Sequence, residues 1–174
     1  MPDLRDRARE DESPYQRMLD FLPGFKGYRE RELRRRADQL LRDHLVGLLD
    51  GERARLQRKA GDLGRQGAVN LELMGPLDRT LGQLTKVRDK IRYADYGYTG
   101  WFDTPQIRED ELDRLYEYDL SLRNFVASIQ EKVGAVVEAE PQDLPAALQA
   151  LDAALHELED MIQHRDEVIQ RVVP

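Results

Sequence analysis

The chain has 174 residues, 40% of them hydrophobic and 35% charged, with a formal net charge of -7 at pH 7 and no cysteine. This composition excludes disulfides, thiolate metal sites and cysteine nucleophiles, and the acidic balance argues against nucleic-acid binding. No run approaches the ~20 apolar residues of a membrane span, and the charged first residues do not resemble a signal peptide. We therefore expect a cytoplasmic protein, at most peripheral to a membrane, built from long amphipathic helices.

The N-terminal part of the chain is predicted to form a tail and a short helix. Residues 1–12 are mostly charged or small, which is typical of disorder, so we assign 13–174 to a single helical-bundle domain. Ser13 suits a helix cap and Pro14 suits the first helical position. A short helix over about 14–22 is expected to follow.

Apolar residues spaced three and four apart predict two long helices in the middle of the chain. The first covers about 28–62 and is expected to end among the three glycines near residue 64, because each glycine weakens a helix interior by ~1 kcal/mol relative to alanine. The second covers about 69–96, with a kink or a restart at Gly75-Pro76. We expect these two helices to form a hairpin.

Two further helices carry heptad repeats. One covers about 105–138 and the other about 143–172, and Pro141 lies in the break between them. Apolar residues seven apart are typical of a coiled-coil seam. Such a row in the first helix is Leu115, Leu122, Ile129 and Val136. The second helix has two rows, Leu144, Leu151, Leu158 and Val172 (with Arg165 in the fourth slot), and Leu148, Leu155, Ile162 and Ile169.

The fold class predicted from these patterns is all-α. We expect an elongated up-down-up-down four-helix bundle or paired coiled-coil hairpins, with a short N-terminal helix. In this topology the turn near residues 64–67 shares one end of the bundle with the turn near Pro141. The aromatic segment at 93–104 and the entry segment at 15–28 are expected to share the other end.

The aromatic corner between the second and third long helices is the first candidate surface. Aromatic side chains are enriched at binding hot spots, so the corner could dock a protein partner. The simpler interpretation is a plug that closes the end of the core, where each aromatic buries ~150–250 Å². The candidate residues are Tyr96, Tyr98, Trp101 and Phe102, joined from the entry segment by Phe25 and Tyr28.

A basic stretch at the start of the first long helix is the second candidate surface, with Arg34, Arg35 and Arg36 at its centre. Because an apolar segment precedes it, residues 14–36 could bind an anionic membrane surface. The alternative is intramolecular pairing with the acidic residues at 109–113, which suit the start of a helix. Pairing would neutralise the arginines and leave no membrane site.

The sequence offers little support for an enzyme. None of the three histidines follows a glutamate at the spacing that a di-iron bundle needs. His156 and His164 could join Glu159, Asp160 and Glu167 in an adventitious metal patch, but a solvated helix face is the simpler interpretation. No phosphate-binding loop, dinucleotide fingerprint or nucleophile elbow occurs, so we assign no catalytic residue, cofactor or metal ligand.

Two segments carry a resemblance to known proteins. The pairing of Phe25-Lys26-Gly27-Tyr28 with the segment at 96–103 resembles short, all-helical, uncharacterised bacterial proteins, and this resemblance implies no activity. A short amphipathic segment before long helical hairpins is also similar in architecture to the phage-shock and ESCRT-III-like membrane-remodelling proteins. The corner at 97–104 departs from that architecture.

These observations favour a non-enzymatic helical interaction or scaffold protein, which binds an unknown protein partner or a second copy of itself. The alternative is a peripheral membrane protein that uses residues 14–36. An enzyme or a metal-binding bundle is the third hypothesis. We expect no nucleic-acid partner.

Overall fold

The computed structural model describes residues 32–65, 71–94 and 109–172, with side chains described for 39–65, 72–94 and 116–164. These ranges are almost entirely helical and contain no strand, which confirms the all-α fold class. The predicted tail at 1–12 and the short helix at 14–22 lie outside them. The four helices are α3 (Glu32–Arg65), α4 (Leu71–Tyr93), α5 (Glu109–Glu138) and α6 (Leu144–Val172).

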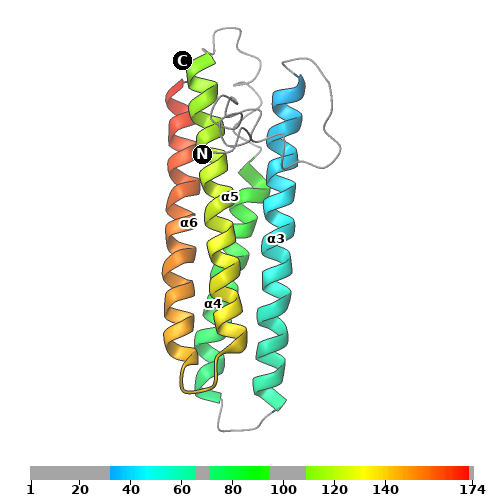
Figure 1. The fold of residues 1–174 in the computed structure, drawn as a ribbon, viewed down its shortest axis with the longest axis vertical. Helices are drawn as coiled ribbons and strands as arrows, with labels where there is room; N and C mark the ends of the chain where they lie inside the picture. The colour runs from blue at the N-terminus through cyan, green and yellow to red at the C-terminus, as the bar shows by residue number, and fades with distance from the viewer. Residues whose placement is uncertain (1–31, 66–70, 95–108, 173–174) are drawn as a thin grey trace, which may run out of the picture.

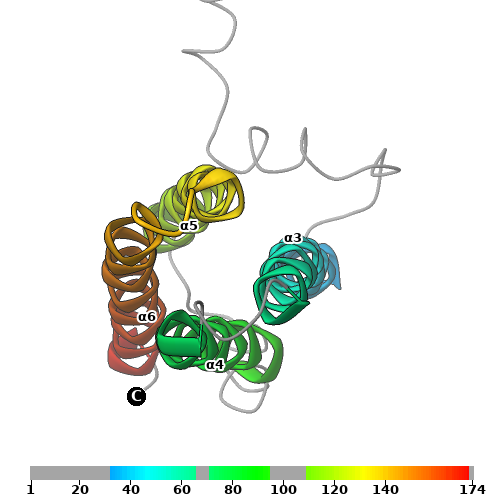
Figure 2. The ribbon, with the colours of Figure 1, turned by 90° about the horizontal axis from the view of Figure 1, so that it is seen from below.

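The helices form an elongated four-helix bundle in which the chain direction alternates from each helix to the next (Figure 1). Seen along its axis, the order around the bundle is α3, α4, α6, α5 (Figure 2). The antiparallel hairpins α3–α4 and α5–α6 therefore lie side by side. Their contacts are made by two parallel pairs, α3 with α5 and α4 with α6. This confirms the predicted four-helix bundle, and its helix order is that of two paired hairpins.

Leucine, isoleucine and valine side chains from all four helices fill the core. The heptad rows predicted for α5 and α6 are buried over the described side chains, and Leu122, Leu151 and Leu155 are at most 4% exposed. Burying one such side chain contributes about 1.5–3 kcal/mol. The bundle is therefore held mainly by its apolar seams.

The end of α3 falls among the glycines, as predicted, whereas α4 does not restart at Gly75-Pro76. Helix α3 continues through Gly61 and Gly64 to Arg65, because Leu56 and Leu63 on the same helix are buried in the core and hold it in place. Helix α4 is unbroken across Pro76, which lies near its beginning. As the sixth residue of α4, Pro76 removes one i→i−4 hydrogen bond from the second turn, and core packing on this and later turns compensates for that loss.

The parallel pair α3–α5 has a constant register. Gln130 donates a hydrogen bond to Glu52, and Lys59 donates one to the carbonyl of Val137, and each of these pairs is 78 residues apart. With the same offset of 78 residues, Arg42 of α3 lies at nearly the same height along the bundle as Asp119 of α5. Both residues are buried. Polar groups thus recur along the seam between the two hairpins, where they can specify which register the hairpins adopt.

The C-terminal ends of α3 and α5 lie at the same end of the bundle, as predicted for the turns that follow them (Figure 1). The turn after α5 is closed by the amides of Asp143 and Leu144, which donate to the carbonyl of Glu140 at 2.9 and 3.0 Å. This end of the bundle holds a hollow that is lined by residues of both helices.

Candidate functional site

The residues predicted to form an interaction surface lie largely outside the described part of the chain. Arg34, Arg35 and Arg36 fall in the first turns of α3, but their side chains are not among those described. The roles predicted for them, including membrane binding, stay predictions. The residues that lie outside the described ranges altogether are Phe25, Tyr28, Tyr96, Tyr98, Trp101 and Phe102.

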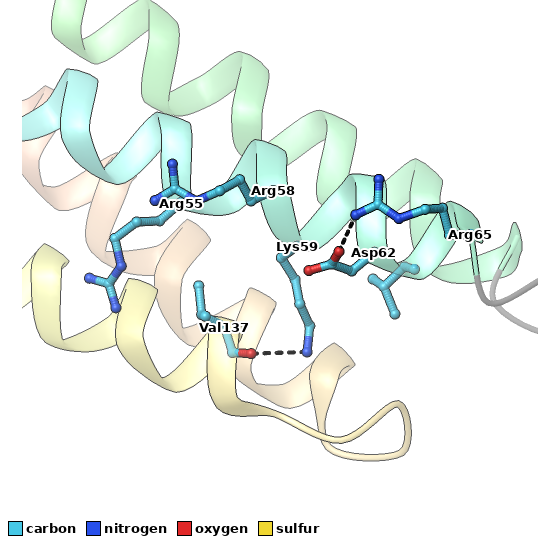
Figure 3. Close-up of a pocket in the computed structure, with 7 residues that line it drawn as sticks. Arg55, Arg58, Lys59, Asp62, Arg65 and Val137 are labelled. Carbon is cyan, nitrogen blue, oxygen red and sulfur yellow. Dashed lines mark hydrogen bonds and ion pairs between the residues drawn. The ribbon is translucent and has the colours of Figure 1, made fainter.

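A different cationic site appears between α3 and α5. A hollow of about 510 Å³ opens at the end of the bundle where both helices finish (Figure 3). We call it the basic groove. Four of its lining side chains are cationic and one is acidic. The lining residues are Arg55, Arg58, Lys59, Asp62, Leu63 and Arg65 from α3, and Val137 from α5.

Helical spacing explains why these charges gather on one side of α3. Arg55, Arg58, Lys59 and Asp62 follow one another at steps of three, one and three residues, which places them on one face. Leu56 faces the core from the adjacent strip of the helix and is fully buried. The charged face therefore borders the seam with α5, where the core gives way to solvent.

Arg55 is held by a buried carboxylate. Its Nη1 lies 2.7 Å from Oε2 of Glu52, a side chain that is only 7% exposed. Gln130 of α5 donates to the other carboxylate oxygen of Glu52 at 3.3 Å. Because a buried carboxylate without partners would be costly, these contacts fix the side chain of Glu52 and, with it, the position of Arg55.

Lys59 closes the C-terminal end of α5. Its Nζ donates to the carbonyls of Val137 and Ala139 at 3.0 and 2.7 Å. The last carbonyls of a helix lack intrahelical partners and carry partial negative charge, so a lysine is well suited to this position. Lys59 thus joins the two helices at the groove, and we assign it a structural role there.

The remaining charges of the groove are more exposed. Arg65 forms an ion pair with Asp62, and these side chains are 76% and 56% exposed. Such an exposed pair contributes little to stability and can exchange partners. Arg58 is exposed and, among the described side chains, has no ion-pair partner. In the basic groove, Arg58 is therefore available to a ligand at once, and Arg65 is available once its weak ion pair with Asp62 opens.

The second parallel pair, α4–α6, has a compact polar cluster around Glu159 of α6. Lys86 and Lys90 place Nζ at 2.8 and 2.6 Å from Oε1, and Gln83 donates to Oε2 at 2.7 Å. The hydrogen bond from Lys86, followed by that from Lys90, lowers the pKa of Glu159 to about 2. Three donors from α4 thus converge on one carboxylate, whose side chain is 12% exposed.

This cluster corrects the description of Glu159 as part of a solvated helix face. Its carboxylate faces α4 and is used there, whereas the neighbouring His156 and Asp160 are exposed. His164 lies beside Tyr118, with the ring centroids 6.2 Å apart. Within the described side chains, no group of three His, Asp or Glu residues is placed to hold a metal ion.

The described surface is polar. Tyr93, at 60% exposure, is the one large hydrophobic side chain exposed among the residues whose side chains are described. None of the described helices has a stretch long and apolar enough to cross a bilayer. Contacts between this part of the molecule and any partner would therefore depend mainly on charge and hydrogen bonds.

The sequence contained a signal for the basic groove. Four cations, Arg53, Arg55, Arg58 and Lys59, fall within seven residues of α3. A denser basic run, Arg34, Arg35 and Arg36, lies at the opposite end of α3. Spacing alone could have identified the cationic face, but only the packing of α5 against it shows that a hollow lies there.

Comparison with known proteins adds no family to this description. No protein-family model, no curated protein and no solved structure matches the chain. The resemblance to short all-helical bacterial proteins stays a prediction, and the function has to be inferred from the residues themselves.

Proposed function

We propose that the chain is a non-enzymatic helical interaction or scaffold protein. The observation that carries this proposal is the basic groove, a cationic hollow at one end of a bundle whose chain is acidic overall. A localised patch of opposite sign on an acidic protein attracts and orients a partner of complementary charge. We take this partner to be a protein and the location to be cytoplasmic.

The architecture supports a binding role over a role that needs large internal motion. Apolar seams fix the four helices, and Glu52 and Lys59 hold the groove between α3 and α5. A preorganised surface loses little conformational entropy when it binds. The charged side chains of the groove are therefore held, before binding, in nearly the geometry that they would have in the complex.

Affinity capture from cells of the source organism tests this proposal. The baits are the wild-type chain, Arg58→Glu and the matched control Arg79→Glu, which makes the same charge change at an exposed site on α4. We expect one or more proteins to be retained by the wild type and the control and depleted by Arg58→Glu. Identical captured sets for all three baits, or none above background in low salt, would contradict a binding role for the groove.

A further inference from the structure

We infer that the basic groove binds an extended, acidic segment of a partner protein, with Asp or Glu carboxylates facing the arginines of α3. This inference rests on the proposed interaction function and names the chemistry of the partner. It follows from three features of the groove: the type of its cations, its length and its mixed lining.

The cations of the groove are mostly arginines. Arg55, Arg58 and Arg65 line it, and Lys59 is already used by the carbonyls at the end of α5. The planar guanidinium donates two parallel hydrogen bonds to one carboxylate, a geometry that a lysine cannot match. Arg58 has no ion-pair partner among the described side chains, so it can bind a carboxylate without breaking an existing ion pair.

The length of the groove favours a ligand with several anionic groups. From Arg55 to Arg65, α3 rises by about 15 Å, at ~1.5 Å for each residue. One small anion would reach a single arginine, whereas an extended peptide at ~3.3 Å for each residue covers this distance with about five residues. Alternate side chains of such a peptide point to the same side, so a segment with acidic residues at every second position would face α3 repeatedly.

The mixed lining favours a peptide over a dense polyanion. Asp62 lies among the cations, and the chain as a whole carries a net charge of -7, so a nucleic acid or a long polyphosphate would meet repulsion around the groove. Val137 is partly exposed in the lining and offers an apolar contact. The aliphatic parts of a peptide can use that contact, whereas phosphate groups cannot.

A direct binding experiment uses fluorescein-labelled octaglutamate as the probe and the full-length protein. We expect fluorescence anisotropy to show saturable binding in about 20 mM salt, weakened at least about tenfold in 200 mM salt, because the attraction is between solvent-exposed charges. Arg58→Gln should weaken binding about tenfold through loss of a charge-assisted hydrogen bond. The matched control Arg79→Gln should leave binding within about twofold of the wild type, because its side chain lies outside the groove.

Three results would overturn the inference: equal binding by Arg58→Gln and Arg79→Gln, binding that ignores salt, or displacement of the peptide by inorganic triphosphate at a lower concentration than by unlabelled octaglutamate. Circular dichroism and thermal unfolding of each variant check that the bundle is intact. Arg65→Gln serves as a second groove variant. If octaglutamate does not bind but affinity capture still depends on Arg58, the acidic-segment inference fails and the interaction function stands. If neither experiment depends on Arg58, both fail.

Discussion

The two parallel helix pairs of the bundle use their cations differently. Between α4 and α6, Lys86 and Lys90 converge on Glu159, together with Gln83. Between α3 and α5, the arginines are spread around a hollow, and Arg58 has no ion-pair partner among the described side chains. Both pairs join the same two hairpins, yet both lysines of the first pair meet a carboxylate of the neighbouring helix, whereas Arg58 of the second pair does not. A cation on a helix face indicates a binding site only where no carboxylate of the neighbouring helix meets it.

The apolar seams common to both pairs should give the largest effects. Leu122→Ala in α5 and Leu151→Ala in α6 each remove a side chain that is at most 4% exposed. We expect the free energy of unfolding to fall by about 2–5 kcal/mol in each case, since truncation leaves a cavity in the core. Urea denaturation followed by circular dichroism measures this loss. Near-neutral effects at both positions would mean that the seams do not hold the bundle.

The contact that Glu52 makes between α3 and α5 should give the next largest effect. Glu52→Ala leaves Gln130 without its carboxylate partner and frees Arg55 from its ion pair. We expect a loss of about 1–3 kcal/mol in the free energy of unfolding, because the partly buried side chains of Gln130 and Arg55 lose hydrogen bonds. Glu52→Gln is the control, since it keeps the shape and part of the hydrogen bonding, and its loss should be smaller. Equal stability of all three proteins would show that this contact does not fix the α3–α5 pair.

The Glu159 cluster makes a prediction about pH. The folded pKa of Glu159 is lowered to about 2, below the ordinary glutamate value of 4.5. The ionised carboxylate therefore stabilises the fold above about pH 4.5, and this stabilisation is lost as the pH falls toward 2. Because Lys86 is 56% exposed and solvent screens the pair, we expect Glu159→Gln to cost only about 1–2 kcal/mol at pH 7.

The difference in unfolding free energy between the wild type and Glu159→Gln should shrink as the pH is lowered from 4.5 to 2. Parallel denaturation series at pH 7, 4.5, 3 and 2.5 measure it. A difference that stays constant over this range would contradict the lowered pKa and, with it, the role of the cluster in joining α4 to α6.

Glycines on the outer side of α3 should give the smallest effect, and in the opposite direction. Gly47 and Gly51 are exposed, and a methyl group at either would meet no atom within 4 Å. Gly47→Ala and Gly51→Ala should each raise the free energy of unfolding by about 0.5–1 kcal/mol, because alanine restricts the unfolded chain. Thermal unfolding measures the gain. Destabilisation would indicate that this side of α3 packs against something that the monomer does not contain.

The sequence predicted the four long helices and the core, because periodicity reports directly on which residues share a helix face. The heptad positions at Leu122, Leu151 and Leu155 are buried as expected. The order of helices around the bundle was not predictable in the same way, since an apolar seam identifies a buried face but not the neighbour that covers it. Polar contacts such as Glu52 with Gln130 distinguish these neighbours, and they link residues far apart in the chain.

The basic groove could not be predicted from the sequence, for a related reason. In the sequence, Arg55 and Arg58 are spaced like cations on any solvated helix face, and Lys86 and Lys90 are spaced four apart in the same manner. Whether such a cation is neutralised depends on a carboxylate of another helix, such as Glu159, which is more than 70 residues away from Lys86. Only the packing of the helices separates the two cases.

The central claim is that Arg58 of the basic groove, which has no ion-pair partner among the described side chains, binds an acidic partner, whereas Lys86 and Lys90 are already paired with Glu159. Titration of the ¹⁵N-labelled protein with octaglutamate, followed by two-dimensional NMR, tests it most directly. The account predicts that shifted backbone amides cluster between Arg55 and Arg65 and around Val137, while those of Lys86 and Lys90 stay unchanged. Shifts of equal size around Lys86 and Lys90, or none near Arg58, would contradict it.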